Sequence, residues 1–518
     1  MKYFEIQNKE RNNKKKETTI KKSKVLYFII LIIFPLLIIY FIQYNNDSSN
    51  STPQTFIKDP NDTKNKYTLE SIKKNPYLQT KYLLNLFSNQ SNINFTLFEK
   101  NIKKLKEKIY SLIENKNTNK DIYITLSCIY GAFLADSMGS FCEFTSFNKN
   151  NHLSIFDKKT IRIFKPGQIT DDSEMAMSQS FAIMDNSNYT QINEHLLYYY
   201  YVIWFNSHPL DIGITTRNAL KHLNINDVNI IDNNIFSETI KKKIYNENYK
   251  SLANGLLMRI SPILSWFYMI NKNYIIEILK SKSNEKYFEL YNKIYIQISK
   301  DSQLTHPNIE NSIAASIFIF MGLCSMQDNI SGNEILEMTK ILFSHNHFNN
   351  KKNEIEYKLL LFFNDNLSQF KDKNFKKENY FGNLSNLMGY YMHAFNLTLY
   401  YLNVFDEQKK NMSLKEVYNN IIFDICDFGG DTDTNAAIVG MVIGPLIGLE
   451  NLDKKYFEVF LNFYSKKRVI YTNVLMYYYI EFLNNIHNLK YKGNDEKYNN
   501  VSFNFIEIIL NVLNNEIE

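Results

Sequence analysis

The sequence predicts an all-α fold, a compact multi-helix domain that follows one transmembrane helix at the amino terminus. Apolar residues keep helical spacing through most of residues 121–490, and no sustained alternation of apolar and polar residues indicates strands. The 518 residues include only 9 Pro and 15 Gly, which is few for a turn-rich β architecture. With 45% hydrophobic and 15% aromatic residues the chain can bury a large core, which excludes wholesale disorder.

The net charge of +6 comes from the amino terminus. Residues 1–24 contain nine Lys or Arg and three Asp or Glu, so residues 25–518 carry 50 charges of each sign. A neutral body offers no general attraction for a phosphate backbone, and we expect no nucleic-acid partner. The four cysteines are too few and too scattered for a disulfide scaffold or a zinc knuckle.

Residues 25–44 (VLYFIILIIFPLLIIYFIQY) are uncharged and predict a transmembrane signal anchor, because about 20 residues let a helix cross a ~30 Å hydrocarbon core. A cleaved signal peptide is the alternative, but the long basic lead and the lack of a small-x-small site disfavour it. Bases before the helix predict a single-pass membrane protein with a cytoplasmic amino terminus and a lumenal or extracellular body. The N-x-S/T triplets at Asn46, Asn50 and Asn61 agree with this topology.

Composition shifts divide the chain into six predicted parts. Ile102, Leu105 and Ile109 keep helical spacing and predict a helix before the main domain. Asn- and Lys-rich stretches near 224–250, 271–300 and 346–380 predict enlarged loops between helices. The parts are a basic cytoplasmic tail (1–24), the anchor (25–44), a polar stalk (45–66), a helical connector (67–120), the main domain (121–490) and a C-terminal helix (491–518).

Two short segments rich in Asp and Thr each precede a helix of small, apolar residues. The first acidic segment is Thr-Asp-Asp-Ser at 170–173, and the second is Asp-Thr-Asp-Thr at 431–434. A helix cap needs only one acid, whereas adjacent carboxylates and hydroxyls suit a hard cation. Such oxygen donors favour Mg²⁺, Mn²⁺ or Ca²⁺ over zinc, and two segments suggest two ions, as in hydrolysis of phosphorylated or glycosidic substrates.

The surroundings of the second acidic segment are rich in glycine. Gly429 and Gly430 supply the backbone freedom for an extended turn in which Asp431 and Asp433 converge while Thr434 opens the helix. Glycines at 440, 444 and 448 recur on one helix face. Because each Gly weakens a helix interior, three in register predict very close approach by another helix.

Four segments together carry a resemblance to a known family. They are GAFLADSMGSFCE (131–143), KPGQITDDSEM (165–175), ANGLLMR (253–259) and GGDTDT (429–434), with smaller matches at 209–217 and 304–307. In this order they resemble the ADP-ribosylglycohydrolase family, and the likeness spans roughly 121–450. Ala135, Ser173 and Pro445 depart from the family's usual Gly, Thr and Ala.

The resemblance implies an all-helical, monomeric catalytic domain with two Mg²⁺ ions, Mn²⁺ being the other candidate. It implies hydrolysis of the N- or O-glycosidic bond between ADP-ribose and a protein side chain or small acceptor, with release of ADP-ribose. The implied metal ligands are Thr170, Asp171, Asp172, Asp431, Asp433 and Thr434. The implied catalytic carboxylates are Glu143, Asp171 and Asp433, and the implied substrate-binding residues are Asp211, Gly213, Asn254, Gly255, Met258, Arg259, His306 and Tyr390.

Two alternatives remain open at this point. One is a non-catalytic ADP-ribose-binding or structural protein that keeps the fold, and the other is a two-metal phosphoesterase. The sequence also leaves open whether the linkage is to arginine, serine or an O-acetyl group.

Overall fold

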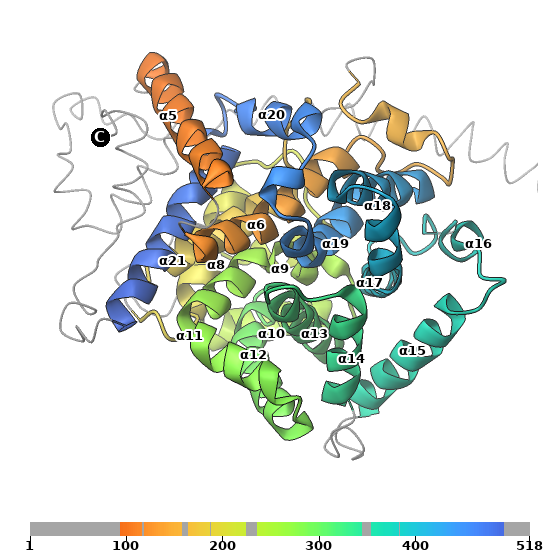
Figure 1. Ribbon diagram of the computed structural model, residues 1–518. Helices are drawn as coiled ribbons and strands as arrows, with labels where there is room; N and C mark the ends of the chain where they lie inside the picture. Colours follow the sequence, from red (N-terminus) through yellow and green to blue (C-terminus); the bar gives the residue numbers. More distant parts are fainter. Residues whose placement is uncertain are drawn as a thin grey trace, which may run out of the picture. The chain divides into compact units, whose positions relative to one another are not determined.

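The computed structural model describes residues 94–115, 119–157, 164–186, 188–223, 236–343, 354–382 and 384–491. All regular secondary structure among them is helical, and the β structure there is one isolated bridge between Ala253 and Tyr390 (Figure 1). This confirms the predicted all-α class.

The α-helices are α5 (Phe95–Glu114), α6 (Lys120–Gly139), α7 (Asp171–Met184), α8 (Glu194–Asn206), α9 (Ile214–Leu220), α10 (Glu238–Asn248), α11 (Ser261–Ser281), α12 (Asn284–Ser302), α13 (Ile309–Ser325), α14 (Gly332–Phe343), α15 (Glu354–Phe370), α16 (Lys377–Phe381), α17 (Tyr391–Asn411), α18 (Leu414–Phe428), α19 (Thr432–Ile447), α20 (Lys454–Asn462) and α21 (Met476–Tyr491). Short 3₁₀ turns are η4 (Asn151–Ser154), η6 (Asn254–Arg259), η9 (Leu449–Asn451), η10 (Val469–Tyr471) and η11 (Asn473–Leu475).

Helices α6 and α19 pack against each other at very close range in the core (Figure 1). A Cβ atom on Gly440 would lie 2.3 Å from the carbonyl oxygen of Gly131, and one on Gly444 would lie 2.3 Å from that of Ser127. Nearly every residue of both helices is buried, as expected for helices that are apolar on all sides. The close approach predicted from the glycine spacing is therefore confirmed for Gly440 and Gly444.

Gly448 has a different role from the one that its spacing predicted. It follows the end of α19 with φ of +80°, so it ends the helix instead of extending the contact face. Pro445 lies in the last turn of α19, which continues to Ile447. Loss of one N–H this close to the helix end leaves the acidic segment at the other end untouched.

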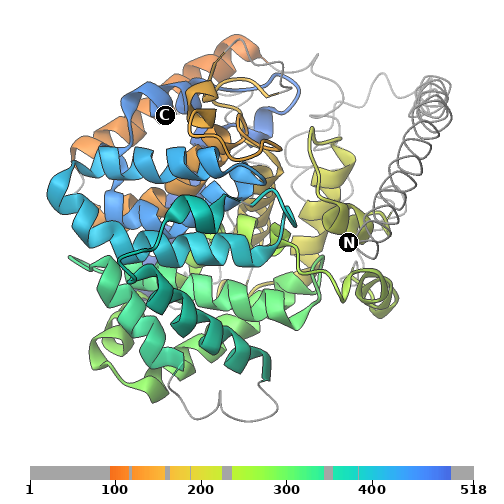
Figure 2. The same ribbon diagram turned by 90° about the vertical axis from the view of Figure 1, so that its right-hand side faces the viewer.

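The remaining helices surround α6 and α19 and fix the positions of their ends. Helix α7 lies against α8, and α17 and α18 run side by side (Figure 2). Helix α18 begins with a capping box, in which Ser413 and Glu416 satisfy each other's backbone N–H groups. It ends at Phe428, directly before the Gly429–Gly430 turn that leads into α19.

The enlarged loops predicted near 224–250, 271–300 and 346–380 are wrong where the structure describes them. Helices α11 and α12 fill 271–300 almost completely, α10 occupies the end of the first stretch, and α15 and α16 occupy most of the third. Exposed Asn and Lys conceal a buried stripe, which in α12 includes Leu290, Ile294 and Ile298. The apolar spacing, and not the polar composition, determined the structure.

The predicted tail, anchor, stalk and C-terminal helix, with the triplets at Asn46, Asn50 and Asn61, lie outside the described residues. Within the described part, Lys120–Gly139 is the helix long and apolar enough to span a membrane, and nearly all of its residues are buried inside the fold, as in a core helix. The connector helix is present as α5, which packs on the domain through Phe98 and Tyr464, with ring centroids 5.3 Å apart. The domain boundaries stay predictions.

Candidate active site

Helix α7 begins at the first acidic segment. Thr170 is its N-cap residue, and its hydroxyl accepts a hydrogen bond from the N–H of Asp172 at 3.4 Å. Asp171 and Asp172 follow in the first turn and are buried. The capping role is thus real for Thr170, but capping does not require two buried carboxylates.

Asp136 of α6 holds this turn in place. Its carboxylate accepts hydrogen bonds from the backbone N–H of Thr170 at 3.1 Å and from the Thr170 hydroxyl at 2.8 Å. It also accepts from the backbone N–H and the hydroxyl of Ser173. The Ser that replaces the family's usual Thr at 173 therefore keeps the hydroxyl that this contact uses.

The second acidic segment lies at the start of α19. The helix begins at Thr432, two residues earlier than predicted, so Asp431 is the N-cap residue and Asp433 lies in the first turn. Gly429 and Gly430 have φ of +75° and +79°, which confirms the predicted need for glycine. The side-chain amide of Asn254 donates to Asp431 at 2.6 Å.

The segment that carries Glu143 is attached to the same turn. The N–H of Phe144 donates to the carbonyl of Gly430, and the N–H of Gly430 donates to the carbonyl of Thr145, both at 2.8 Å. These two hydrogen bonds join residues nearly 300 positions apart in the chain. They bring Glu143 next to the second acidic segment.

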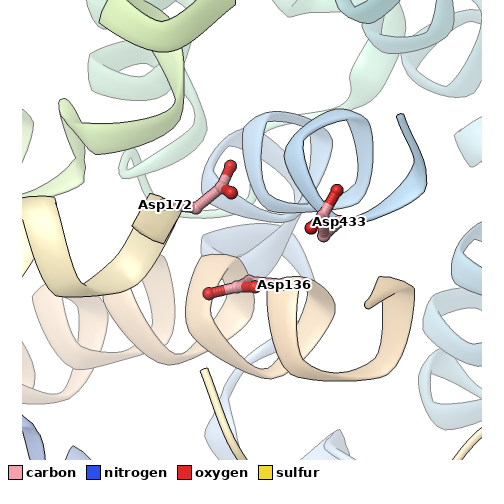
Figure 3. A group of neighbouring side chains, drawn as sticks. All are labelled: Asp136, Asp172 and Asp433. Atoms are coloured by element: carbon pink, nitrogen blue, oxygen red, sulfur yellow. The ribbon is translucent and has the colours of Figure 1, made fainter. Parts of the chain in front are cut away.

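Carboxylates from three helices converge between the helix ends (Figure 3). Asp136, Asp172 and Asp433 each offer an oxygen atom within 4.8 Å of the others, and so do Glu143, Asp211 and Asp433. Asp433 belongs to both groups. Each group could hold a metal ion.

The electrostatics of these carboxyl groups favour bound cations. Burial, with Asp431, Asp211 and Asp171 nearby, raises the pKa of Glu143 to about 9. Burial and neighbouring carboxylates also raise the pKa values of Asp171, Asp172 and Asp433 well above their usual range. Among the described residues, Oδ1 of Asp172 has no hydrogen-bond partner although it is buried. Ionising these groups together is costly without a compensating positive charge.

A cavity of about 470 Å³ opens beside the cluster. None of the described residues that line it is Lys or Arg, so these residues supply no fixed positive charge there. Its lining includes most of the predicted site: Glu143, Asp171, Asp211, Gly213, Asn254, Gly255, Met258, His306, Asp431, Asp433 and Thr434. Thr170, Asp172, Arg259 and Tyr390 do not line it.

Arg259 lies in the core and does not line the cavity. Its guanidinium pairs with Asp301 at 3.0 Å, and both side chains are fully buried. It also donates to the hydroxyl of Thr305 at 2.8 Å and lies 4.5 Å from the ring centre of Tyr201. Tyr390 directly precedes α17 without a side-chain capping hydrogen bond, and the bridge to Ala253 attaches it to the segment that carries Asn254.

His306 links this buried network to the cavity. Its Nδ1 lies 2.8 Å from the Thr305 hydroxyl, and its ring faces Gly255, where a Cβ atom would come within 2.8 Å of Nε2. Burial and then the nearby Arg259 lower the pKa of His306 well below its usual range. His306 is therefore a neutral imidazole at the cavity wall.

Asp136 is the residue of the cluster to which sequence reasoning gave no role. It lies within the segment 131–143, but its partners Thr170 and Ser173 lie 34 and 37 positions away. Burial raises its pKa to about 6, against the opposing hydrogen bonds from Ser173 and Thr170. The available signal was an acid within an otherwise apolar, buried helix.

The chain is similar in sequence to known proteins. The sequence profile of the ADP-ribosylglycohydrolase family matches residues 121–472. A predicted ADP-ribosyl glycohydrolase of Acanthamoeba polyphaga mimivirus is 29% identical over 341 residues, which cover 62% of this chain and 86% of that protein. A solved structure of an ADP-ribosylglycohydrolase-related protein complex is 14% identical, with a TM-score of 0.43, over 70% of this chain and 98% of that one. Because the family profile matches more than half of this chain, the chain belongs to the ADP-ribosylglycohydrolase family.

Proposed function

We propose that the protein is a Mg²⁺-dependent hydrolase that cleaves the N- or O-glycosidic bond of ADP-ribose attached to a protein side chain or a small acceptor. The observation that carries the proposal is the presence of two clusters of carboxylate side chains beside the cavity. One contains Asp136 and Asp172, the other contains Glu143 and Asp211, and Asp433 belongs to both. Family membership supports hydrolase activity.

The oxygen donors that line the cavity or lie directly beside it fit two divalent cations. Thr170, Asp171, Asp172, Asp431, Asp433 and Thr434 would hold them, with Mn²⁺ as the other candidate. When bound, the ions would supply Lewis acidity and offset negative charge that develops in the transition state. Asp136 would act through Thr170 and Ser173 as a positioning residue.

Glu143 is our first candidate for proton transfer. It lines the cavity beside the second acidic segment, where a carboxyl group can donate a proton to the leaving group. Once ionised, it can accept a proton from the attacking water. Asp171 and Asp433, which also line the cavity, are the other proposed catalytic carboxylates.

The proposed contacts to ADP-ribose come from residues around the same cavity. Asp211 and Gly213 lie on one side, and Asn254, Gly255 and Met258 lie on η6. His306 completes this wall. Arg259 would act by positioning His306 through Thr305, and Tyr390 by holding the segment of Asn254.

The test uses the full-length protein in detergent with ADP-ribosylated proteins that carry arginine or serine linkages, and with O-acetyl-ADP-ribose. We expect release of ADP-ribose that requires Mg²⁺ and stops with EDTA, and a loss of at least about 100-fold in the rate for Glu143→Gln. Absence of metal-dependent release from all three substrates contradicts the proposal. Release of AMP instead would identify a phosphoesterase, and binding without turnover a non-catalytic protein.

We also propose that residues 25–44 anchor the protein as a single-pass membrane protein with a cytoplasmic amino terminus. The uncharged 20-residue run and the basic residues before it support this topology. Endoglycosidase-sensitive glycosylation at Asn46 or Asn50 is the expected result. A body that is unglycosylated and open to cytoplasmic protease contradicts the proposed orientation.

A further inference from the structure

Large apolar side chains are exposed around the mouth of the cavity. Phe144, Ile214 and Met388 line it while 70%, 80% and 37% of their surfaces are exposed. Leu210 and Leu387, each next in sequence to a lining residue, are 51% and 75% exposed. We call these five residues the apolar rim. Within the described residues, five of the eleven exposed large apolar side chains belong to it.

The backbone of each rim segment is strained. Phe144 has φ of +61° and Leu387 has φ of +55°, and His208, two residues before Leu210, has φ of +54°. Bulky residues rarely adopt this left-handed conformation, and such strain persists where the surrounding structure imposes it. Hydrogen bonds impose it here, from the N–H of Phe144 to Gly430 and from the N–H of Tyr390 to the carbonyl of Leu387.

The rim and the cavity floor differ in charge. The floor is lined by the carboxylates Glu143, Asp171, Asp211, Asp431 and Asp433, whereas no rim residue is charged. The phosphates of ADP-ribose gain nothing from an uncharged apolar surface, so the substrate groups that suit the rim are the adenine ring and the acceptor. The acceptor is the group bonded to the carbon at which the proposed catalytic Glu143 acts, and Phe144 of the rim directly follows Glu143, which favours the acceptor.

The position of Phe144 agrees with this assignment. It follows Glu143 directly, and the two hydrogen bonds to Gly430 fix it beside the second acidic segment. If Glu143 exchanges protons with the leaving group, the acceptor leaves past Phe144. The rim comes from three separate chain segments, at 144, 210–214 and 387–388, so an acceptor that contacts more than one of them has to be larger than acetate, as a polypeptide is.

We propose that the apolar rim determines acceptor specificity by binding apolar side chains that flank the modified residue of a polypeptide. The inference rests on the proposed function and names its preferred substrate class. Burying one such side chain against the rim is sufficient for about a tenfold preference.

The experiment compares three substrates of the full-length protein with Mg²⁺. Two are ADP-ribosylated peptides of one length and linkage, flanked by Leu or by Ser, and the third is O-acetyl-ADP-ribose. We expect kcat/KM for the Leu-flanked peptide to exceed that for the Ser-flanked peptide about tenfold, mainly through KM. Leu387→Asn should reduce this ratio several-fold, and Asn tolerates the left-handed backbone, so the variant should fold.

Leu361→Asn is the matched control, because Leu361 is also exposed, at 45%, but lies on α15 outside the rim. For this variant, the ratio of kcat/KM for the Leu-flanked peptide to kcat/KM for the Ser-flanked peptide should equal that of the wild type. Equal rates for the two peptides overturn the inference alone. The inference is also overturned if Leu387→Asn lowers the hydrolysis of O-acetyl-ADP-ribose as much as the hydrolysis of the Leu-flanked peptide. That result would assign the rim to the nucleotide. No release from any of the three substrates overturns the proposed function and the inference with it.

Discussion

Asp136 accepts hydrogen bonds from both the backbone N–H and the hydroxyl of Thr170. This contact joins the core helix α6 to the first turn of α7, which carries Asp171 and Asp172. The Thr170 hydroxyl also lies 2.9 Å from Oδ2 of Asp172, but its single proton can be donated to only one of the two acids. Asp136 therefore helps to set the geometry of the proposed metal ligands without lining the cavity.

Asp136→Asn should weaken Mg²⁺ binding and activity. The amide keeps only one accepting oxygen, so buried donors of Thr170 or Ser173 lose their partner, at about 1–3 kcal/mol for each group left unsatisfied. Isothermal titration with Mg²⁺ and the rate of ADP-ribose release measure the two effects. Asp453→Asn makes the same chemical change at the N-cap of α20 and should leave both unchanged. Unaltered Mg²⁺ affinity in Asp136→Asn would contradict the positioning role.

Gly131→Ala should destabilise the fold strongly. The new Cβ would lie 2.6 Å from the carbonyl oxygen of Gly440 and 2.8 Å from the Cα of Gly444, and backbone atoms cannot rotate away. We expect a loss of about 3 kcal/mol in the free energy of unfolding, at the upper end of ordinary overpacking. Denaturant unfolding followed by tryptophan fluorescence measures it, since the only two tryptophans, Trp204 and Trp266, are both buried.

Gly213→Ala is the matched control for that substitution. A Cβ there meets nothing within 4 Å, and φ of −62° suits any residue. Its unfolding midpoint should equal or slightly exceed that of the wild type. Equal midpoints for Gly131→Ala and the wild type would show that α6 and α19 can separate without loss.

The parts of the site that could be predicted from the sequence are those that depend on residues close together in the chain. The segments at 170–173 and 431–434 place their acids in the first turn or N-cap of a helix, and Gly429 and Gly430 have the positive φ that their types suggested. The spacing of Gly440 and Gly444 predicted close packing. Glycine weakens a helix interior, and this loss is offset when the absence of a side chain lets a neighbouring helix backbone pack closely.

The parts that sequence reasoning missed depend on partners far away in the chain. The role of Asp136 depends on its contact with the start of α7. Arg259 was assigned to substrate by its place in the ANGLLMR segment, whereas the structure buries it against Asp301, which carries no motif of its own. In α12, the exposed Asn and Lys favour a loop by composition, whereas the apolar spacing favours the helix that the structure shows.

Asp301→Asn should destabilise the fold by about 3–5 kcal/mol, because it leaves the Arg259 guanidinium buried without its counter-charge. The double variant Arg259→Met, Asp301→Leu should lose less than the single one, since it removes both charges. Denaturant unfolding of Arg259→Met, of Asp301→Leu and of the variant with both changes forms a double-mutant cycle. Additive losses would show that the pair contributes nothing beyond its separate side chains.

The metal-free protein should become less stable as pH rises from about 4 towards 9. The Glu143 carboxyl has its pKa raised to about 9 in the fold, whereas the unfolded chain loses this proton near pH 4.3. Between these values the folded state binds more protons than the unfolded state, so the free energy of unfolding falls with rising pH. The raised pKa values of Asp171, Asp172 and Asp433 act in the same direction.

Added Mg²⁺ should reverse this trend, because the cation favours the ionised carboxylates and binds only the folded state. The rise in Tm on adding Mg²⁺, measured by tryptophan fluorescence in detergent, should therefore be larger at pH 8 than at pH 6. Glu143→Gln removes one of the titrating groups and should flatten the pH dependence in EDTA. Stability that rises between pH 6 and 8 in EDTA, or a Mg²⁺ effect independent of pH, would mean that these carboxyl groups are not the cation site, because a site built from raised-pKa carboxylates has to exchange protons for metal.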